Sequence, residues 1–167
     1  VISSTGPHFC GGLDVDMFMA GDVKDDSTDV TRRRQKAANF LNTVSLMQDS
    51  FSSLETCRLP VLAAIQGGCI GGGVDLVTAC DMRYATRDAF MTIYETKIGM
   101  TADVGTFPRI VKLIPEGLVR EMAYTGRRVS AEEARDMGLV NRVYDSHEDM
   151  LAGVMEIARE IAANAPL

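Results

Sequence analysis

The stretch Val61-Leu62-Ala63-Ala64-Ile65-Gln66-Gly67-Gly68-Cys69-Ile70-Gly71-Gly72-Gly73-Val74-Asp75 carries the strongest structural signal in the sequence. Its first part, residues 61–65, is wholly apolar, as expected of a strand buried on both faces. Five glycines lie within residues 67–73, and the mostly apolar segment 74–80 follows them. We therefore predict a buried strand, a glycine-rich turn and a buried helix that begins near Gly72.

The glycine cluster excludes two common phosphate-binding motifs. No Gly-Lys-Ser/Thr follows it, and no G-x-G-x-x-G can be placed across it. Glycine allows a ligand to approach the backbone closely, and the first amides of a helix are unpaired donors at its positive end. Such donors suit a developing oxyanion. Tight packing of the helix on the strand explains the same glycines, and spacing alone leaves both interpretations open.

A second glycine turn lies at Phe9-Cys10-Gly11-Gly12-Leu13-Asp14, after a strand that we predict at residues 1–4. Taken alone it is an ordinary turn. Its interest is that an oxyanion hole with two donors needs an N–H from a separate loop.

The regions on either side alternate between helix and strand patterns. Apolar residues at steps of three and four predict a helix from Thr31 that Pro60 terminates, with one face made of Phe40, Val44, Met47, Phe51 and Leu54. We predict strands at residues 82–86, 90–94 and 139–144, and helices at 107–114, 118–124 and from Ser146 onward. This alternation indicates an α/β domain.

The segment Ser130-Ala131-Glu132-Glu133 reads as a capping box that starts a further helix, which Gly138 ends. In that arrangement the Ser130 hydroxyl and the Glu133 carboxylate each accept from a free N–H group.

Three carboxylates stand in unusual surroundings. Asp75 lies in an apolar segment, where a charge is costly unless it is paired or functional. Glu95 ends a predicted strand, and Asp103 sits in an apolar loop between Gly99 and Gly105. Singly they read as a buried hydrogen-bonded acid, a solvated strand end and a helix N-cap. Together they could supply acids and bases with separated pKa values.

Composition removes several function classes. The 167 residues fit one domain, and 17 Lys and Arg against 23 Asp and Glu give a net charge of −6. This charge argues against binding to nucleic acid or to an anionic membrane. The run Arg32-Arg33-Arg34 with Lys36 reads as a solvated helix face. Four cysteines without a C-x-x-C pair indicate reduced thiols and no metal site, and two histidines without a nucleophile elbow argue against a triad hydrolase.

The two ends suggest a single domain, residues 1–167, that lacks its native N-terminus and its last C-terminal helices. Val1 is not an initiator methionine, and residues 162–167 resemble a helix end before a proline.

These features together resemble the crotonase superfamily, also called the enoyl-CoA hydratase/isomerase family, over nearly the whole chain. The resemblance rests on residues 9–14, 60–67, 71–76, 80–85, 131–134 and 138–140 in this order and spacing. It implies a spiral of strand–strand–helix turns, with C-terminal helices that build homotrimers or hexamers. It implies an acyl-CoA substrate, with coenzyme A as part of the substrate and no separate cofactor. Compartment then follows the organism: cytoplasm in bacteria, mitochondrial or peroxisomal matrix in eukaryotes.

The resemblance also implies roles for individual residues. Leu13 and Gly72 occupy the positions of the two backbone donors that hold the thioester carbonyl. The residues beside them would line the acyl-CoA site: Gly12, Leu13, Asp14, Val15, Asp16 and Gly73. Hydratases of the family carry Glu at the position of Asp75 and typically glycine at that of Asp103.

The acids Asp75, Glu95 and Asp103, spaced by 20 and 8 residues, are similar to the set of the Δ3,5-Δ2,4-dienoyl-CoA isomerase subgroup. This predicts that Asp103 takes a proton from C2, that Glu95 delivers one at C6 and that Asp75 orients or polarises the site. The alternatives are an enoyl-CoA hydratase that activates water with Asp75 and Glu95, a non-catalytic or RNA-binding relative and, more remotely, a thioester hydrolase or dehalogenase.

Overall fold

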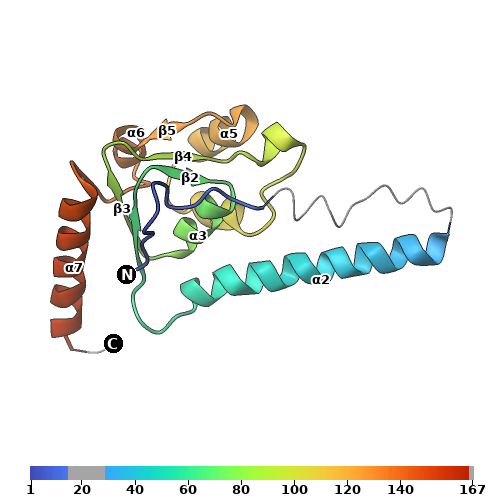
Figure 1. The fold of residues 1–167 in the computed structure, drawn as a ribbon, viewed down its shortest axis with the longest axis horizontal. Helices are drawn as coiled ribbons and strands as arrows, with labels where there is room; N and C mark the ends of the chain where they lie inside the picture. Colours follow the sequence, from blue (N-terminus) through green and yellow to red (C-terminus); the bar gives the residue numbers. More distant parts are fainter. Residues whose placement is uncertain (15–28, 166–167) are drawn as a thin grey trace.

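The computed structural model describes residues 1–14 and 29–165 and consists of two small sheets surrounded by helices (Figure 1). Parallel strands form one sheet in the order β1-β3-β6, and the other has the order β2-β4-β5, in which β4 and β5 are antiparallel. The strands are β1 (Leu62–Ile65), β2 (Gly68–Ile70), β3 (Met82–Thr86), β4 (Phe90–Thr92), β5 (Val129–Ser130) and β6 (Arg142–Tyr144). The helices are α2 (Val30–Glu55), α3 (Gly72–Ala79), η1 (Glu95–Ile98, a 3-10 helix), α4 (Thr106–Ile110), α5 (Glu116–Thr125), α6 (Ala131–Asp136) and α7 (His147–Ala163).

The first four strands enter the two sheets alternately, which produces the predicted spiral. β1 joins the first sheet, β2 the second, and α3 then returns the chain to β3 beside β1. The next turn repeats this order, with β3 followed by β4 beside β2. The predicted α/β class and strand–strand–helix repeat are therefore confirmed, whereas trimerisation stays a prediction.

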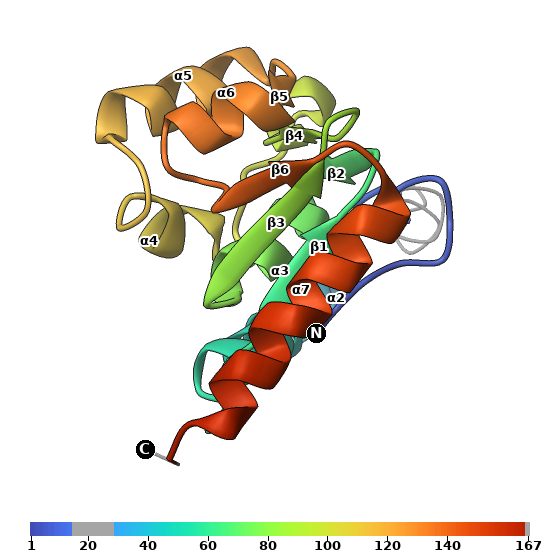
Figure 2. The same ribbon diagram turned by 90° about the vertical axis from the view of Figure 1, so that its left-hand side faces the viewer.

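The first sheet has a hydrophobic core on each face. Alternate residues of a strand point to opposite faces, so Ala63 and Ile65 of β1 enter the main core, whereas Leu62 and Ala64 contact α7. Figure 2 shows α7 lying across β1 and β3. The predicted continuous apolar strand at residues 61–65 is explained by this burial on both sides.

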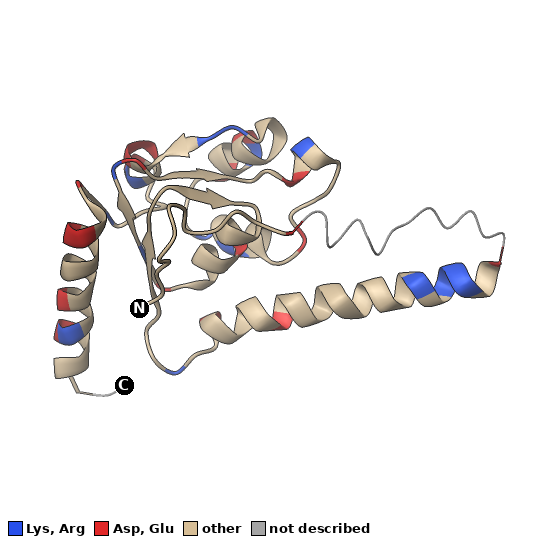
Figure 3. Ribbon diagram, viewed as in Figure 1, with Lys and Arg blue, Asp and Glu red and all other residues tan. Residues whose placement is uncertain are grey.

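Helix α2 begins where Asp29 accepts a hydrogen bond from the Thr31 amide, and most of its length is exposed. It extends well beyond the body of the molecule, and its Lys and Arg residues gather near its first turns (Figure 3). Its last half lies against α3. The helix ends at Glu55, earlier than the predicted stop at Pro60.

Several predicted strands are shorter in the structure. Residues 1–4 form only an isolated bridge between Ile2 and Ala63. The predicted strand at 90–94 ends at Thr92, and the one at 139–144 begins at Arg142. Conversely, β2 lies inside the glycine cluster, which was predicted as a turn, and β5 was not predicted. A glycine-rich segment and a segment of two residues both lack a recognisable strand pattern in the sequence. Pairing with neighbouring strands therefore determines that these segments are strands.

Two helix predictions need correction. The helix predicted at 107–114 is the short α4, because the chain turns after Ile110. The capping box is half formed: the Ser130 hydroxyl accepts from the Glu133 amide at 3.2 Å. The Glu133 carboxylate instead forms a salt bridge with Arg127, so it does not cap the helix.

We expect Gly73→Ala to destabilise the fold by about 1–3 kcal/mol, the usual cost of overpacking. A Cβ at Gly73 would lie 2.9 Å from Cys10 Cβ and 3.2 Å from Cys69 Sγ, where β2 and α3 meet. Urea unfolding measures the loss. Gly117→Ala in α5 is the matched control, since nothing lies within 4 Å of its added Cβ. Equal stability of the two variants would contradict the packing argument.

Candidate active site

Two glycine turns far apart in sequence lie side by side. The Cys10 amide donates to the Gly68 carbonyl at 3.1 Å, and the Ile70 amide donates to the Cys10 carbonyl at 3.0 Å. Gly12 has a φ of 91°, and a Cβ there would lie 3.0 Å from the Ile70 carbonyl oxygen. Only glycine allows this approach, which brings the first turn against the start of α3.

Two backbone amides, those of Leu13 and Gly72, lie at the ends of these two turns. Gly72 is the first residue of α3, where an amide has no partner inside the helix. Within the described part of the chain, neither the Leu13 nor the Gly72 N–H donates to another backbone group. Both residues line one cavity. That these two amides form an oxyanion hole and donate to a substrate stays a prediction.

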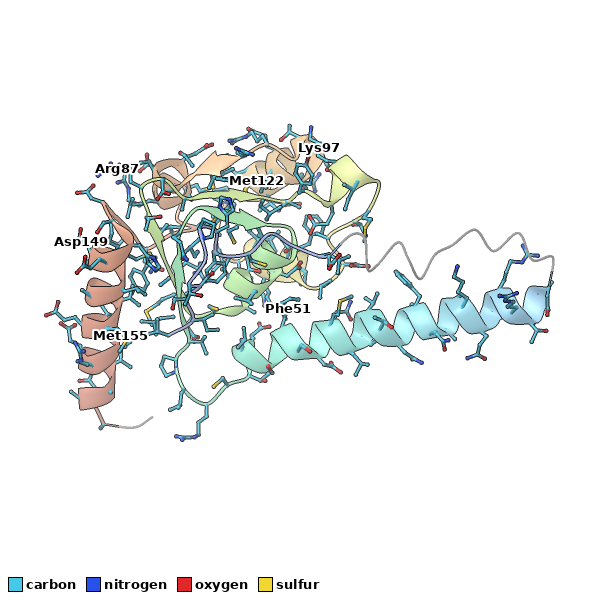
Figure 4. All side chains as sticks on the ribbon, in the orientation of Figure 1. Phe51, Arg87, Lys97, Met122, Asp149 and Met155 are labelled. Carbon is cyan, nitrogen blue, oxygen red and sulfur yellow. The ribbon has the colours of Figure 1, made fainter. Side chains whose placement is uncertain are left out.

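This cavity has a volume of about 540 Å³ and mostly apolar walls. Helix α2 supplies one wall through Phe40, Val44, Met47 and Phe51, the apolar face that the sequence predicted. Figure 4 shows Phe51 on the side of α2 that faces the body of the molecule. Three carboxylates, Asp75, Glu95 and Asp103, line the same cavity.

Asp75 is almost fully buried, with 1% of its surface exposed. Its Oδ1 accepts hydrogen bonds from the Thr106 amide at 2.7 Å and the Thr106 hydroxyl at 2.8 Å. Burial raises the pKa of Asp75, while the Thr106 hydrogen bonds and the positive charge of Arg109 oppose that rise. Asp75 is therefore the hydrogen-bonded buried acid that one interpretation of the sequence predicted, and it also lines the cavity.

Glu95 begins η1 and is half-buried, so the interpretation as a solvated strand end is wrong. Its Oε1 lies 3.1 Å from the position that a Cβ on Gly71 would take, so the carboxylate lies beside the residue that precedes Gly72. Its Oε2 is buried and has no hydrogen-bond partner among the described residues. Burial raises the pKa of Glu95, and the charges of Asp75 and Asp103 raise it further. These effects outweigh the backbone hydrogen bonds, which lower the pKa of Glu95.

Asp103 lies in the loop between η1 and α4 and is partly exposed to the cavity. Its negative charge raises the pKa of both Asp75 and Glu95, so the three acids form one electrostatic group. Its backbone carbonyl accepts from Gln48 of α2 at 2.6 Å. The N-cap of α4 is Gly105, so the interpretation of Asp103 as a helix cap is wrong.

The remaining predicted binding residues have mixed positions. Gly12 lines the cavity together with Leu13. Gly73 is buried against Cys10 and Cys69, and Asp14 is exposed. Val15 and Asp16 lie outside the described residues. Binding of acyl-CoA by these residues stays a prediction.

Sequence reasoning missed two contributors to the site. Thr106 donates two hydrogen bonds to Asp75. Its position directly after Gly105 was the sequence signal that could have pointed to it. The guanidinium carbon of Arg128 lies 4.3 Å from the centroid of the Phe90 ring, and both residues line the cavity. Nothing in the sequence distinguishes Arg128 from other exposed arginines.

Residues 1–14 and 29–165 contain no group of three or more His, Cys, Asp or Glu side chains arranged to hold a metal ion. The expectation that the site needs no metal stays a prediction. In the same residues, no helix combines the length and apolar character of a membrane span.

Comparison with known proteins identifies the family. The profile of the enoyl-CoA hydratase/isomerase family matches residues 1–167, so the chain belongs to that family. The peroxisomal Delta(3,5)-Delta(2,4)-dienoyl-CoA isomerase of Arabidopsis thaliana is 39% identical over 167 residues, which are 100% of this chain and 59% of that protein. The mitochondrial isomerase of the same name from Homo sapiens is 43% identical over 168 residues, covering 100% of this chain and 50% of that protein.

Solved structures agree with this assignment. A putative enoyl-CoA hydratase from Thermobifida fusca YX, in complex with acetoacetyl-CoA, has a TM-score of 0.85 at 28% identity, covering 98% of this chain and 63% of that one. The enoyl-CoA hydratase of Bacillus anthracis has a TM-score of 0.80 at 33% identity, covering 98% and 58%. The resemblance to the crotonase superfamily is thus confirmed. The chain spans between 50% and 59% of the two curated relatives named above.

We expect Glu95→Gln to stabilise the folded protein at neutral pH. Burial raises the pKa of Glu95 in the folded state. Ionisation of Glu95 therefore costs more free energy in the folded state than in the unfolded state. The stability of the wild type relative to the variant is therefore highest at low pH. It falls as the pH rises from about 4.3, the unfolded value, through the raised folded pKa. Urea unfolding over this pH range measures the difference.

Glu156→Gln is the control, since Glu156 is exposed on α7. A difference between wild type and Glu95→Gln that does not grow with pH would contradict the argument.

Proposed function

We propose that this chain is the acyl-CoA-binding core of a Δ3,5-Δ2,4-dienoyl-CoA isomerase, which converts 3,5-dienoyl-CoA to 2,4-dienoyl-CoA in fatty-acid β-oxidation. The observation that carries the proposal is the convergence of Asp75, Glu95 and Asp103 on one apolar cavity beside the amides of Leu13 and Gly72. Identity of 39–43% to isomerases of this name supports the same reaction.

In this mechanism the two amides hold the thioester oxygen, and Asp103 removes a proton from C2. The resulting dienolate spreads its charge from the thioester oxygen to C6, and preorganised donors stabilise such an oxyanion. Glu95, whose raised pKa favours its protonated form, delivers a proton at C6. One proton leaves and one enters, so the substrate is neither oxidised nor reduced. Exchange with solvent then resets the two acids.

Asp75 supports this chemistry indirectly. Its hydrogen bonds with Thr106 fix the start of α4, immediately after the loop that carries Asp103. Its charge also raises the pKa of Glu95. These contacts support the predicted role of Asp75 in orienting and polarising the site.

Hydration of 2-enoyl-CoA by Asp75 and Glu95 is the alternative reaction. The engagement of Asp75 Oδ1 by two donors from Thr106 favours a supporting role over that of a base that activates water.

The proposal also covers the whole protein. It forms a homotrimer or hexamer and has no nucleic-acid or membrane partner. In a eukaryote it lies in the mitochondrial or peroxisomal matrix. The relatives of Arabidopsis and human support that location by their names.

We expect the purified protein to convert a 3,5-dienoyl-CoA to its conjugated 2,4-isomer, and Asp103→Asn to lose this activity by a factor of about 10²–10⁴, the usual contribution of a general base. The absorbance of the conjugated product measures the rate, and calorimetry with a non-isomerisable acyl-CoA measures binding, which we expect to be retained. Undiminished isomerisation by Asp103→Asn would contradict the proposal. Hydration of crotonyl-CoA at a rate that Asp103→Asn leaves unchanged would favour the hydratase.

The Gly72 amide allows a direct test of the oxyanion hole. Gly72→Pro removes the N–H at the first helical position, where proline is tolerated. We expect it to lower kcat/KM by about 10²–10³, as loss of one oxyanion donor does elsewhere. Gly72→Ala is the matched control, because it keeps the N–H and its Cβ meets nothing within 4 Å. Equal activity of the two variants would show that this amide is not a donor.

A further inference from the structure

Arg109 of α4 is a buried cation that contacts both α2 and the loop that carries Asp103. It is 7% exposed, although arginine is rarely buried without partners. Its Nε donates to Glu55 Oε2 at 2.9 Å, and its Nη2 donates to Ser52 Oγ at 3.0 Å. Both partners lie in the last turns of α2, the helix whose apolar face forms a wall of the cavity. Arg109 therefore connects α4 to that wall.

The remaining edge of the guanidinium rests against the loop that carries Asp103. A Cβ on Gly105 would lie 1.9 Å from Arg109 Nη1 and 2.9 Å from its Cζ, so the group occupies the space beside the Gly105 Cα. Nη1 is buried and has no hydrogen-bond partner among the described residues. Gly105 has a φ of 124°, a conformation that side chains rarely adopt. A side chain at position 105 would therefore be strained by this backbone conformation and would collide with the Arg109 guanidinium.

The Asp103 loop, residues 99–105, has two other attachments near this end. Gln48 of α2 donates to the Asp103 carbonyl at 2.6 Å. Thr106, directly after the loop, donates to Asp75 of α3. Arg109 lies between these attachments, because it contacts Gly105 on one side and α2 on the other.

We propose that Arg109 is a positioning residue that fixes the Asp103 loop against α2, and thereby holds the Asp103 carboxylate in the cavity. The proposal rests on the proposed function, in which Asp103 is the base at C2. Arg109 is not among the residues that line the cavity in the described part of the chain, so it acts through the loop.

The charge of Arg109 gives independent support. It lowers the pKa of Asp75, against the effect of burial, and so favours the ionised form that accepts from Thr106. The same side chain thus supports this end of the loop in two ways, by contact with Gly105 and by its charge at Asp75.

Arg109→Lys tests the proposal. Lysine keeps the positive charge but lacks the planar fork that binds two partners while it covers Gly105. We expect kcat for isomerisation to fall by about 10–100-fold, since displacement of a catalytic group by about 1 Å has effects of this size. We expect KM to change less than about threefold, because the residue does not touch the cavity. Hydrogen–deuterium exchange of residues 99–105 should accelerate, while exchange in β1 and β3 stays unchanged.

Two further variants keep the result interpretable. Arg120→Lys is the matched control, because Arg120 is exposed and forms its salt bridge within α5, with Glu116. Ser52→Ala is the milder variant should Arg109→Lys fail to fold, since it removes one partner of the guanidinium. We expect it to accelerate exchange in the same loop and to lower kcat by a smaller factor.

Wild-type kcat and loop exchange in folded Arg109→Lys would overturn the proposal, as would faster exchange spread evenly over the chain. If Arg109→Lys does not fold, unchanged loop exchange in Ser52→Ala has the same meaning. A wild type without isomerase activity would contradict the proposed function instead. Loop exchange needs no substrate and still decides whether Arg109 holds the loop.

Discussion

Two hydrogen bonds from Thr106 to the buried carboxylate of Asp75 join α3 to α4, and the site is arranged around this charge. A carboxylate with 1% exposure would be strongly destabilising without such partners. The hydrogen bonds between Thr106 and Asp75 fix the end of the loop before α4, and therefore the position of Asp103. The same charge raises the pKa of Glu95 across the cavity. Asp75 thus contributes both to the position of Asp103 and, after burial, to the raised pKa of Glu95.

Much of the fold could be predicted because its signals are local. The apolar run before the glycines predicted β1, and three- and four-residue steps predicted the face of α2 that lines the cavity. The prediction failed where pairing with distant strands decides the structure. Gly68–Ile70 became β2 because it lies between Cys10 and β4, and residues 1–4 kept only one bridge. No local pattern encodes either outcome.

The candidate site was predicted in its parts but not in its connections. Their local surroundings in the sequence marked Asp75, Glu95 and Asp103 as unusual, and the resemblance to a family grouped them. Thr106 and Arg109 escaped notice because a threonine and an arginine on a helix have many ordinary explanations. Their importance comes from burial and from partners on other helices, which are properties of the folded chain. Seven glycines of residues 1–14 and 29–165 have positive φ, yet only their neighbours in space tell which ones serve the site.

The way residues 1–14 attach to the molecule has a consequence for how activity is lost. Leu13, one half of the proposed oxyanion hole, is held by an edge segment with a few backbone hydrogen bonds to β1 and β2. Asp75 and Glu95 instead belong to α3 and η1, which pack against α4 and α5, and Asp103 lies in the loop between η1 and α4. Edge segments open locally at much lower free energy than cores do. Mild heating or a low denaturant concentration should therefore detach residues 1–14 and abolish activity while the spiral of strands remains folded. Cooling after mild heating should restore the activity.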